Sequence, residues 1–239
     1  MSDLQLGAWA GALLSALWVT VYLTVLSAIA AFLVSLVLGL MARQQHVVPR
    51  TIARVIIEFF RGTSLLVQIF WLFFVLPQLG FRFQPLAVAV IALGLNFGAY
   101  GAEVVRGALN AVPKAQWEGA IALNLTPYQR MRRVIFPQAL PLMIPPFNNL
   151  LIQLLKSTPL VFLIGLGDLT FIGDQYRDSL GNENFIFPLL LVIYFVLSYV
   201  LTLFMHLLEA RAKARLGQRE ERRKILAFHG PMEEEMEPT

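Results

Sequence analysis

Long apolar runs separated by short polar segments dominate this chain, and five of these runs are long enough to cross a membrane. A spanning helix needs about 20 apolar residues, and the first run carries no charge between Asp3 and Arg43. We therefore predict an all-α membrane protein with five transmembrane helices in one domain, residues 1–210. The expected spans lie at about 11–41, 54–77, 85–109, 139–164 and 185–209.

The charges between the spans predict their orientation. Lys and Arg of membrane proteins collect in short segments that face the cytosol. Here they gather in 43–50, in 113–137 and in the tail 211–239, whereas 166–184 is mostly acidic. The N-terminus is therefore expected outside and the C-terminus inside. The tail is basic over 209–226 and acidic at 233–235, which suits either a solvated surface or attraction to anionic lipid.

Composition excludes several functional classes. With 57% hydrophobic and 14% charged residues, the chain is too apolar for a soluble domain. The net charge of +4 follows the topology and gives no reason to expect nucleic acid. The chain has no cysteine, and its three histidines are scattered, so we expect no metal site.

The chain also lacks the motif that binds ATP. A phosphate-binding loop requires GxxxxGK[ST], and no Gly-Lys dipeptide occurs here. Hydrolase motifs are absent as well. We therefore expect a chain that is not an enzyme and binds no cofactor. If transport is active, ATP and Mg²⁺ belong to a partner subunit.

The segment 113–137 is a long polar connection that predicts two short helices. Pro113 suits a first helical turn, and Glu118 lies where the helix dipole favours a carboxylate. The helix is expected to end near Asn124, since Asn readily adopts left-handed geometry. Its apolar face is expected at three positions: Trp117, Ala120 and Ile121.

A second helix should start directly after this turn. Thr126 is suited to the N-cap, Pro127 to the first turn, and Gln129 stands at the capping-box position. This helix is expected to run to Phe136, with the chain restarting at Pro137. Its basic side carries Arg130, Arg132 and Arg133.

These residues resemble the EAA loop of ABC-importer permeases, whose pattern is Glu-Ala-Ala, a glycine after three residues, and Ile-x-Leu-Pro. In that family the loop docks on the ATP-binding subunit. The resemblance implies the following coupling residues: Glu118, Gly119, Ala120, Asn124, Arg130, Arg132, Arg133 and Pro137. Gly119 replaces an alanine, at a helix cost of roughly 1 kcal/mol. Asn124 replaces the glycine, which its left-handed tendency tolerates.

Three further segments resemble the polar-amino-acid branch of that family: RGTSLLVQ (61–68), AYGAEVVRGA (99–108) and PPFNNLLIQLLKSTPL (145–160). The resemblance implies an importer permease for a polar amino acid or related zwitterion, including a compatible solute such as ectoine. The implied partners are a homodimeric ATP-binding subunit, a second permease copy or a sister permease, an extracytoplasmic solute-binding protein and the lipid bilayer. The implied location is the bacterial cytoplasmic (inner) membrane.

Ionisable and polar residues inside spans are candidates for function. Glu58 and Arg61, and likewise Glu103 and Arg106, are three residues apart and share a helical face. These pairs either hold helices together or contribute to a substrate path.

The fourth predicted span carries a polar stripe. Lys156 has no acid within a helical turn and needs a partner from another span or a polar cavity. The prolines of this span, Pro141, Pro145, Pro146 and Pro159, should break or kink it, as in helices that line transport cavities. A substrate path and a helix–helix seam both remain open. The candidate path residues are Gln68, Glu103, Asn149, Gln153 and Lys156.

Two other functional classes remain at this point. A gradient-driven secondary carrier or channel would need intramembrane ion sites and commonly inverted repeats, and no internal repeat is visible. A membrane scaffold or sensor has only the basic tail in its favour.

Overall fold

The computed structural model describes residues 3–180 and 183–215, and no strand occurs within these ranges. The helices are α1 (Asp3–Met41), α2 (Val47–Gly62), α3 (Leu65–Phe70), α4 (Pro85–Ala111), α5 (Lys114–Ala122), α6 (Pro127–Arg130), α7 (Phe136–Ser157), α8 (Leu169–Leu180) and α9 (Glu183–Arg215). Short π and 3-10 turns extend α3 (71–79), join α6 to α7 (131–135) and follow α7 (158–164). Of the predicted tail 211–239, residues 216–239 lie outside the described ranges.

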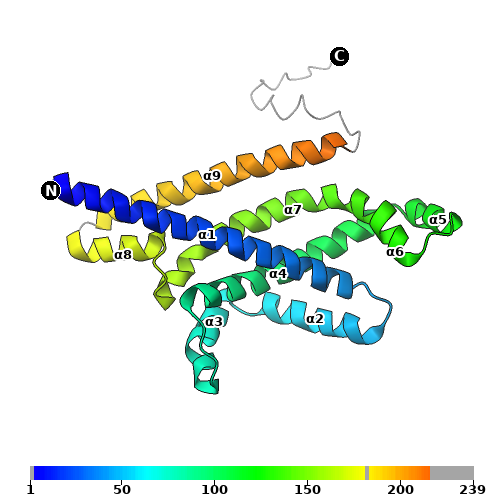
Figure 1. Ribbon diagram of the computed structural model, residues 1–239, viewed down its shortest axis with the longest axis horizontal. Coiled ribbons are helices and arrows are strands. Elements are labelled where there is room, and N and C mark those ends of the chain that lie inside the picture. Colours follow the sequence, from blue (N-terminus) through cyan, green and yellow to red (C-terminus); the bar gives the residue numbers. More distant parts are fainter. Residues whose placement is uncertain (1–2, 181–182, 216–239) are drawn as a thin grey trace, which may run out of the picture.

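Four helical stretches in the described ranges are long and apolar enough to cross a membrane: Gly11–Met41, Pro85–Ala111, Pro127–Ile164 and Phe185–Glu209. A fifth is present if the bent pair α2–α3 counts as one span. Figure 1 shows the long helices extending along the longest axis of the molecule. The α5–α6 turn lies at one end, and α8 and the start of α1 lie at the other.

The closest helix packing joins α1 to α4, and small residues make it possible. A Cβ atom at Gly98 would lie 2.6 Å from Cγ1 of Val34 and 3.2 Å from the carbonyl oxygen of Ala31. The hydroxyl of Ser35 donates to the Gly98 carbonyl at 3.1 Å. Close backbone approach and interhelical hydrogen bonds are the usual means of association in lipid, where apolar burial gives little drive.

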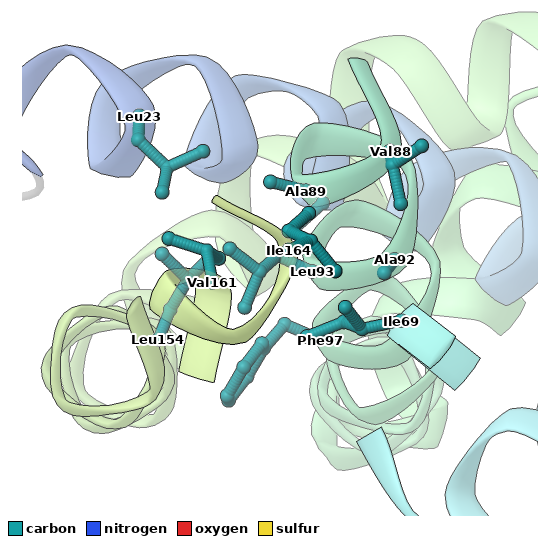
Figure 2. Close-up of a cluster of buried hydrophobic side chains, with 11 residues drawn as sticks. Leu23, Ile69, Val88, Ala89, Ala92, Leu93, Phe97, Leu154, Val161 and Ile164 are labelled. Carbon is teal, nitrogen blue, oxygen red and sulfur yellow. The ribbon is translucent and has the colours of Figure 1, made fainter. Parts of the chain in front are cut away.

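A buried apolar cluster ties α1, α3, α4 and α7 together (Figure 2). Leu93 of α4 and Ile69 of α3 are fully buried in it, and Val161 reaches it from the turn after α7. This cluster fixes the positions of the elements that carry the polar residues of the spans.

The predicted second span, 54–77, is not one straight helix. Thr63 and Ser64 adopt extended backbone angles, and the stretches Val47–Gly62 and Leu65–Leu79 meet at 103°. The length of an apolar run does not reveal such a bend, because the helices on both sides of it are apolar and together have the length of one span. The helix also begins earlier than predicted, at Val47.

The predicted restart at Pro137 is wrong, since the chain is helical from Pro127 through Ile164. A π turn over 131–135 precedes the proline, and the N–H of Phe136 bonds the carbonyl of Met131. This wider turn shifts the hydrogen-bond ladder, so the missing N–H of Pro137 leaves no break. The helix also continues through Pro141, Pro145 and Pro146, and Pro159 begins the 3-10 turn after it.

Candidate functional site

Helix α5 is fastened to the bundle by its inner face. Ala120 is 2% exposed, and Trp117 packs beside the buried cluster around Leu109 and Ile135. The guanidinium of Arg43 lies 4.2 Å from the centroid of the Trp117 ring, a cation–π distance. At the other side, Nε2 of Gln138 in α7 donates to Oε1 of Gln116 at 3.1 Å. The orientation of α5 is therefore set by α1 and α7 together.

The predicted end of α5 near Asn124 is confirmed, since the helix ends at Ala122. Asn124 has a φ of 52°, the one positive φ among non-glycine residues in the described ranges. Its N–H bonds the carbonyl of Ile121 at 2.8 Å, and the N–H of Leu125 bonds that of Ala120 at 3.1 Å. These two bonds form a Schellman motif, which satisfies the last free carbonyls of the helix.

The predicted capping box at the start of α6 is also confirmed. Oγ1 of Thr126 accepts from the N–H of Gln129 at 3.3 Å, and Oε1 of Gln129 accepts from the N–H of Thr126 at 3.1 Å. The Schellman motif ends at Leu125 and the capping box begins at the next residue, Thr126, so the turn has little freedom to move relative to its helices.

The outer face of this turn carries exposed apolar residues. Leu123 is 75% exposed, Tyr128 67% and Ile121 53%. Of the predicted apolar face of α5, Ala120 is buried and Trp117 half-buried, whereas Ile121 is exposed.

Charged side chains surround this tip. Glu118, Arg132 and Arg133 are exposed, whereas Arg130 is half-buried. Nη1 of Arg132 donates to the hydroxyl of Tyr128 at 3.1 Å. Gly119 is exposed, and a Cβ atom at this position would have no neighbour within 4 Å. Pro137, in the first turn of α7, is also exposed.

Among the candidate path residues, Gln68 supports the bend between α2 and α3. Its Nε2 donates to the carbonyl of Phe60 at 3.0 Å and to the hydroxyl of Thr63 at 2.8 Å. Nδ2 of Asn96 donates to the same Phe60 carbonyl at 2.9 Å and to Oε1 of Gln68 at 3.3 Å. These amides replace partners that the interrupted helix loses, so Gln68 is part of a helix–helix seam.

The two acid–base pairs expected in spans two and three are present. Glu58 lies 3.6 Å from Arg61, and Glu103 accepts from Nε of Arg106 at 3.0 Å. Tyr100 connects the two helices, because its hydroxyl donates to the carbonyl of Arg61 at 3.3 Å. The geometry makes Glu103 an internally paired residue of α4.

The other three candidates share one face of α7. Asn149, Gln153 and Lys156 are all exposed in the single chain. Lys156 lines a cavity of about 490 Å³ between α7 and α9, together with Tyr194, Ser198 and other residues: Ile152, Leu191, Phe195, Tyr199 and Thr202. Among the side chains that the structure describes, no acid lies within ion-pair distance of Lys156.

Sequence reasoning missed a buried polar cluster at the opposite end. Asp168 is fully buried and caps α8, accepting from the N–H of Phe171 at 2.9 Å and from the Tyr194 hydroxyl at 3.2 Å. The N–H of Leu169 bonds the hydroxyl of Thr20 in α1 at 3.1 Å. Burial raises the pKa of Asp168, and the hydrogen bonds partly oppose that rise. An acid directly before an apolar helical run was the available signal for this cap.

Comparison with known families identifies a match over residues 31–214. The matching family is the binding-protein-dependent transport system inner membrane component. It covers both the α5–α6 turn and the polar face of α7.

Individual relatives agree with this match. The chain is similar to a probable amino-acid ABC transporter permease protein of Sinorhizobium fredii, 43% identical over 84% of this chain and 87% of the relative. It is 35% identical to the permease protein of the L-cystine transport system of Bacillus subtilis, over 82% and 84%. A solved amino acid ABC transporter with histidines matches with a TM-score of 0.79 at 32% identity, covering 88% of this chain and 99% of that one.

Proposed function

The chain belongs to the family of binding-protein-dependent transport system inner membrane components, and on this premise we propose that it forms part of an import path for a polar amino acid. Permeases of this family work with an ATP-binding subunit and a solute-binding protein. ATP hydrolysis belongs to that separate subunit, so this chain is a transport component and not an enzyme. Neither a gradient-driven carrier nor ectoine as cargo is supported by the relatives, whose names refer to amino-acid ABC transporters or to an L-cystine transport system.

The α5–α6 turn is the proposed docking surface for the ATP-binding subunit. The observation that carries this proposal is Leu123, 75% exposed on a turn held by two capping motifs. An exposed apolar anchor surrounded by charges is the usual composition of a protein contact. Glu118, Arg132 and Arg133 supply those charges, and Ala120 and Asn124 fix the shape of the turn. Gly119, Arg130 and Pro137 complete the proposed contact surface. Mg²⁺ and ATP would be held by the partner, which we take to be a homodimer.

We further propose five spans with the N-terminus outside and the C-terminus in the cytosol of a bacterial inner membrane. In this arrangement α2–α3 together make one broken crossing, and the α5–α6 turn and the end of α1 face the cytosol. The supporting observation is that the basic segments after α1 and around α6 lie near one another, at the end of the molecule opposite to α8 (Figure 1).

The polar face of α7 is the best candidate for the substrate path. Its support is the exposure of Asn149, Gln153 and Lys156 on one side of an apolar bundle, where exposed polar groups in lipid would be unfavourable. A second copy or a sister permease would cover this face and enclose the path. An ammonium without an acid partner in the described chain suits the carboxylate of an amino acid. Gln68 and Glu103, by contrast, already have internal partners.

Purification from native membranes tests the function most simply. The protein extracted in mild detergent should carry an ATP-binding subunit, and uptake should stop when ATP is depleted. Glu118→Lys should abolish uptake and loosen the ATP-binding subunit while leaving membrane insertion intact. Arg82→Glu, a charge reversal in the 80–84 loop, serves as the control and should transport normally. Uptake that continues without ATP, or normal transport by Glu118→Lys, would remove the basis of the proposal.

A further inference from the structure

Four arginines surround a small cavity where the end of α1, the start of α2 and the end of α4 meet. The cavity has a volume of about 210 Å³, and its lining residues are Ala42, Arg43, Gln44, Arg50, Arg54, Arg106 and Asn110. None of these lining residues is acidic. Three helices thus bring cationic groups together in one place.

Most of this charge has no internal counterion. Arg106 is paired with Glu103, but no acid whose side chain the structure describes lies within ion-pair distance of Arg43, Arg50 or Arg54. The Nη1 atom of Arg43 is also buried and has no hydrogen-bond partner among the described residues. Burial lowers the pKa of Arg43, which reflects the unfavourable removal of its charge from water. Clustered, partly desolvated cations repel one another, and a bound anion would offset both effects.

The surface beside the cavity is apolar. Val48, Ile52, Val55 and Phe59 follow one another at helical spacing along α2, and their exposed fractions are 69%, 49%, 63% and 58%. Arg50 and Arg54 are placed between them and turn to the cavity side. The arginines lie in the first half of α2, next to this apolar face, so lipid tails and a charged head group could be contacted by the same helix. The occupant of this region therefore has an apolar part and an anionic part.

We propose that this cavity binds the phosphate of an anionic phospholipid of the cytosolic leaflet, with the acyl chains lying along the apolar face of α2. Basic pockets between transmembrane helices on the cytosolic side have the chemistry for such head groups. Arg43 connects this cavity to the proposed docking surface, because the same guanidinium lies over the ring of Trp117 in α5. Lipid binding would thereby hold the end of α1 against α5. The proposal rests on the orientation proposed above.

The test uses the complete purified transporter in nanodiscs that contain equal amounts of phosphatidylglycerol and phosphatidylcholine. Lipids that stay bound are identified by native mass spectrometry, and uptake is measured in parallel in vesicles. The wild type should retain phosphatidylglycerol preferentially. Arg50→Gln/Arg54→Gln should lose about thirtyfold of this preference, since each arginine near the surface contributes roughly a factor of five.

Two control variants make the result specific. Arg50→Lys/Arg54→Lys should keep most of the preference, and Arg82→Gln should leave it unchanged. An unchanged preference in the double glutamine variant would overturn the proposal. Displacement of the lipid by inorganic phosphate would do the same, because the cavity would then be a site for the free anion. If the double glutamine variant lost the ATP-binding subunit but kept its lipid preference, the proposal would also be overturned, because the arginines would then contact that subunit and not a lipid. Uptake of the wild type reports separately on the proposed function.

Discussion

The guanidinium of Arg43 lies 4.2 Å from the ring centroid of Trp117, and this contact joins the end of α1 to α5. Trp117 also packs beside the buried cluster of α4 and α7 around Leu109 and Ile135. A movement imposed on the α5–α6 turn therefore reaches three long helices at once. Binding of a partner at the α5–α6 turn could therefore move the membrane-spanning helices.

Replacing Trp117→Leu should weaken this connection while keeping most of the apolar packing. Loss of a partly desolvated cation–π contact predicts a decrease in the free energy of unfolding of about 1–2 kcal/mol, or roughly 2–8 °C in Tm. Thermal unfolding in detergent and uptake in vesicles measure the two effects. Trp18→Leu, at a 70% exposed position of α1, is the control and should change neither. Equal behaviour of the two variants would show that the contact is dispensable.

Asn124 should tolerate glycine and reject alanine. Its φ of 52° costs alanine about 1–2 kcal/mol, whereas glycine adopts this geometry freely. Asn124→Ala should therefore loosen the turn and lower uptake, and Asn124→Gly should match the wild type. Hydrogen exchange at the amide of Leu125, whose bond to Ala120 closes the motif, reports the loosening directly. If the Leu125 amide exchanged as slowly in Asn124→Ala as in the wild type, this account of the cap would be contradicted.

The packing of α1 on α4 predicts a contrast between two glycines of the same helix. A Cβ atom at Gly98 would meet Cγ1 of Val34 at 2.6 Å, but one at Gly107 would have no neighbour within 4 Å. Gly98→Ala should destabilise the chain by about 1–3 kcal/mol through overpacking, while Gly107→Ala should be neutral or slightly stabilising. Tm and the yield of monodisperse protein distinguish them. If Gly98→Ala and Gly107→Ala had the same Tm and yield, the close approach of α1 and α4 at Gly98 would not contribute to stability.

Local signals predicted the local features of this chain. Asn124, Thr126 and Gln129 could be assigned from sequence because helix caps depend on residues only a few positions apart. Apolar run length identified the long helices for the same reason.

Features that depend on distant residues could not be predicted. The bend between α2 and α3 is held by Asn96, which is 36 residues away from Phe60. The pair Asp168–Tyr194 joins two elements whose contact no spacing rule describes. The exposure of Leu123 likewise depends on how α5 packs against α1 and α7, so the apolar tip of the candidate docking surface was missed.

The burial of Asp168 predicts a pH dependence of stability. Burial raises its pKa above the ordinary value of 3.8, so the folded chain binds this proton more tightly than the unfolded chain does. At pH values below the pKa of Asp168 in the unfolded chain, the protonated carboxyl makes its full contribution to the free energy of unfolding. This contribution is lost as the pH rises through the pKa of Asp168 in the folded chain. Asp168→Asn removes this titration. The Tm of the wild type should fall relative to that of Asp168→Asn across this pH window, and parallel curves would refute the assignment.

The labelling rate of a single cysteine at the tip of the α5–α6 turn tests the docking surface most directly. The chain has no cysteine of its own, so Leu123→Cys introduces the sole thiol of this subunit. Arg82→Cys, in the 80–84 loop, provides the matched control. Maleimide labelling is measured for the permease alone and for the permease assembled with its ATP-binding subunit. The account predicts that assembly strongly slows labelling at position 123 and leaves position 82 unchanged. Equally fast labelling at position 123 in both states would show that the ATP-binding subunit docks elsewhere.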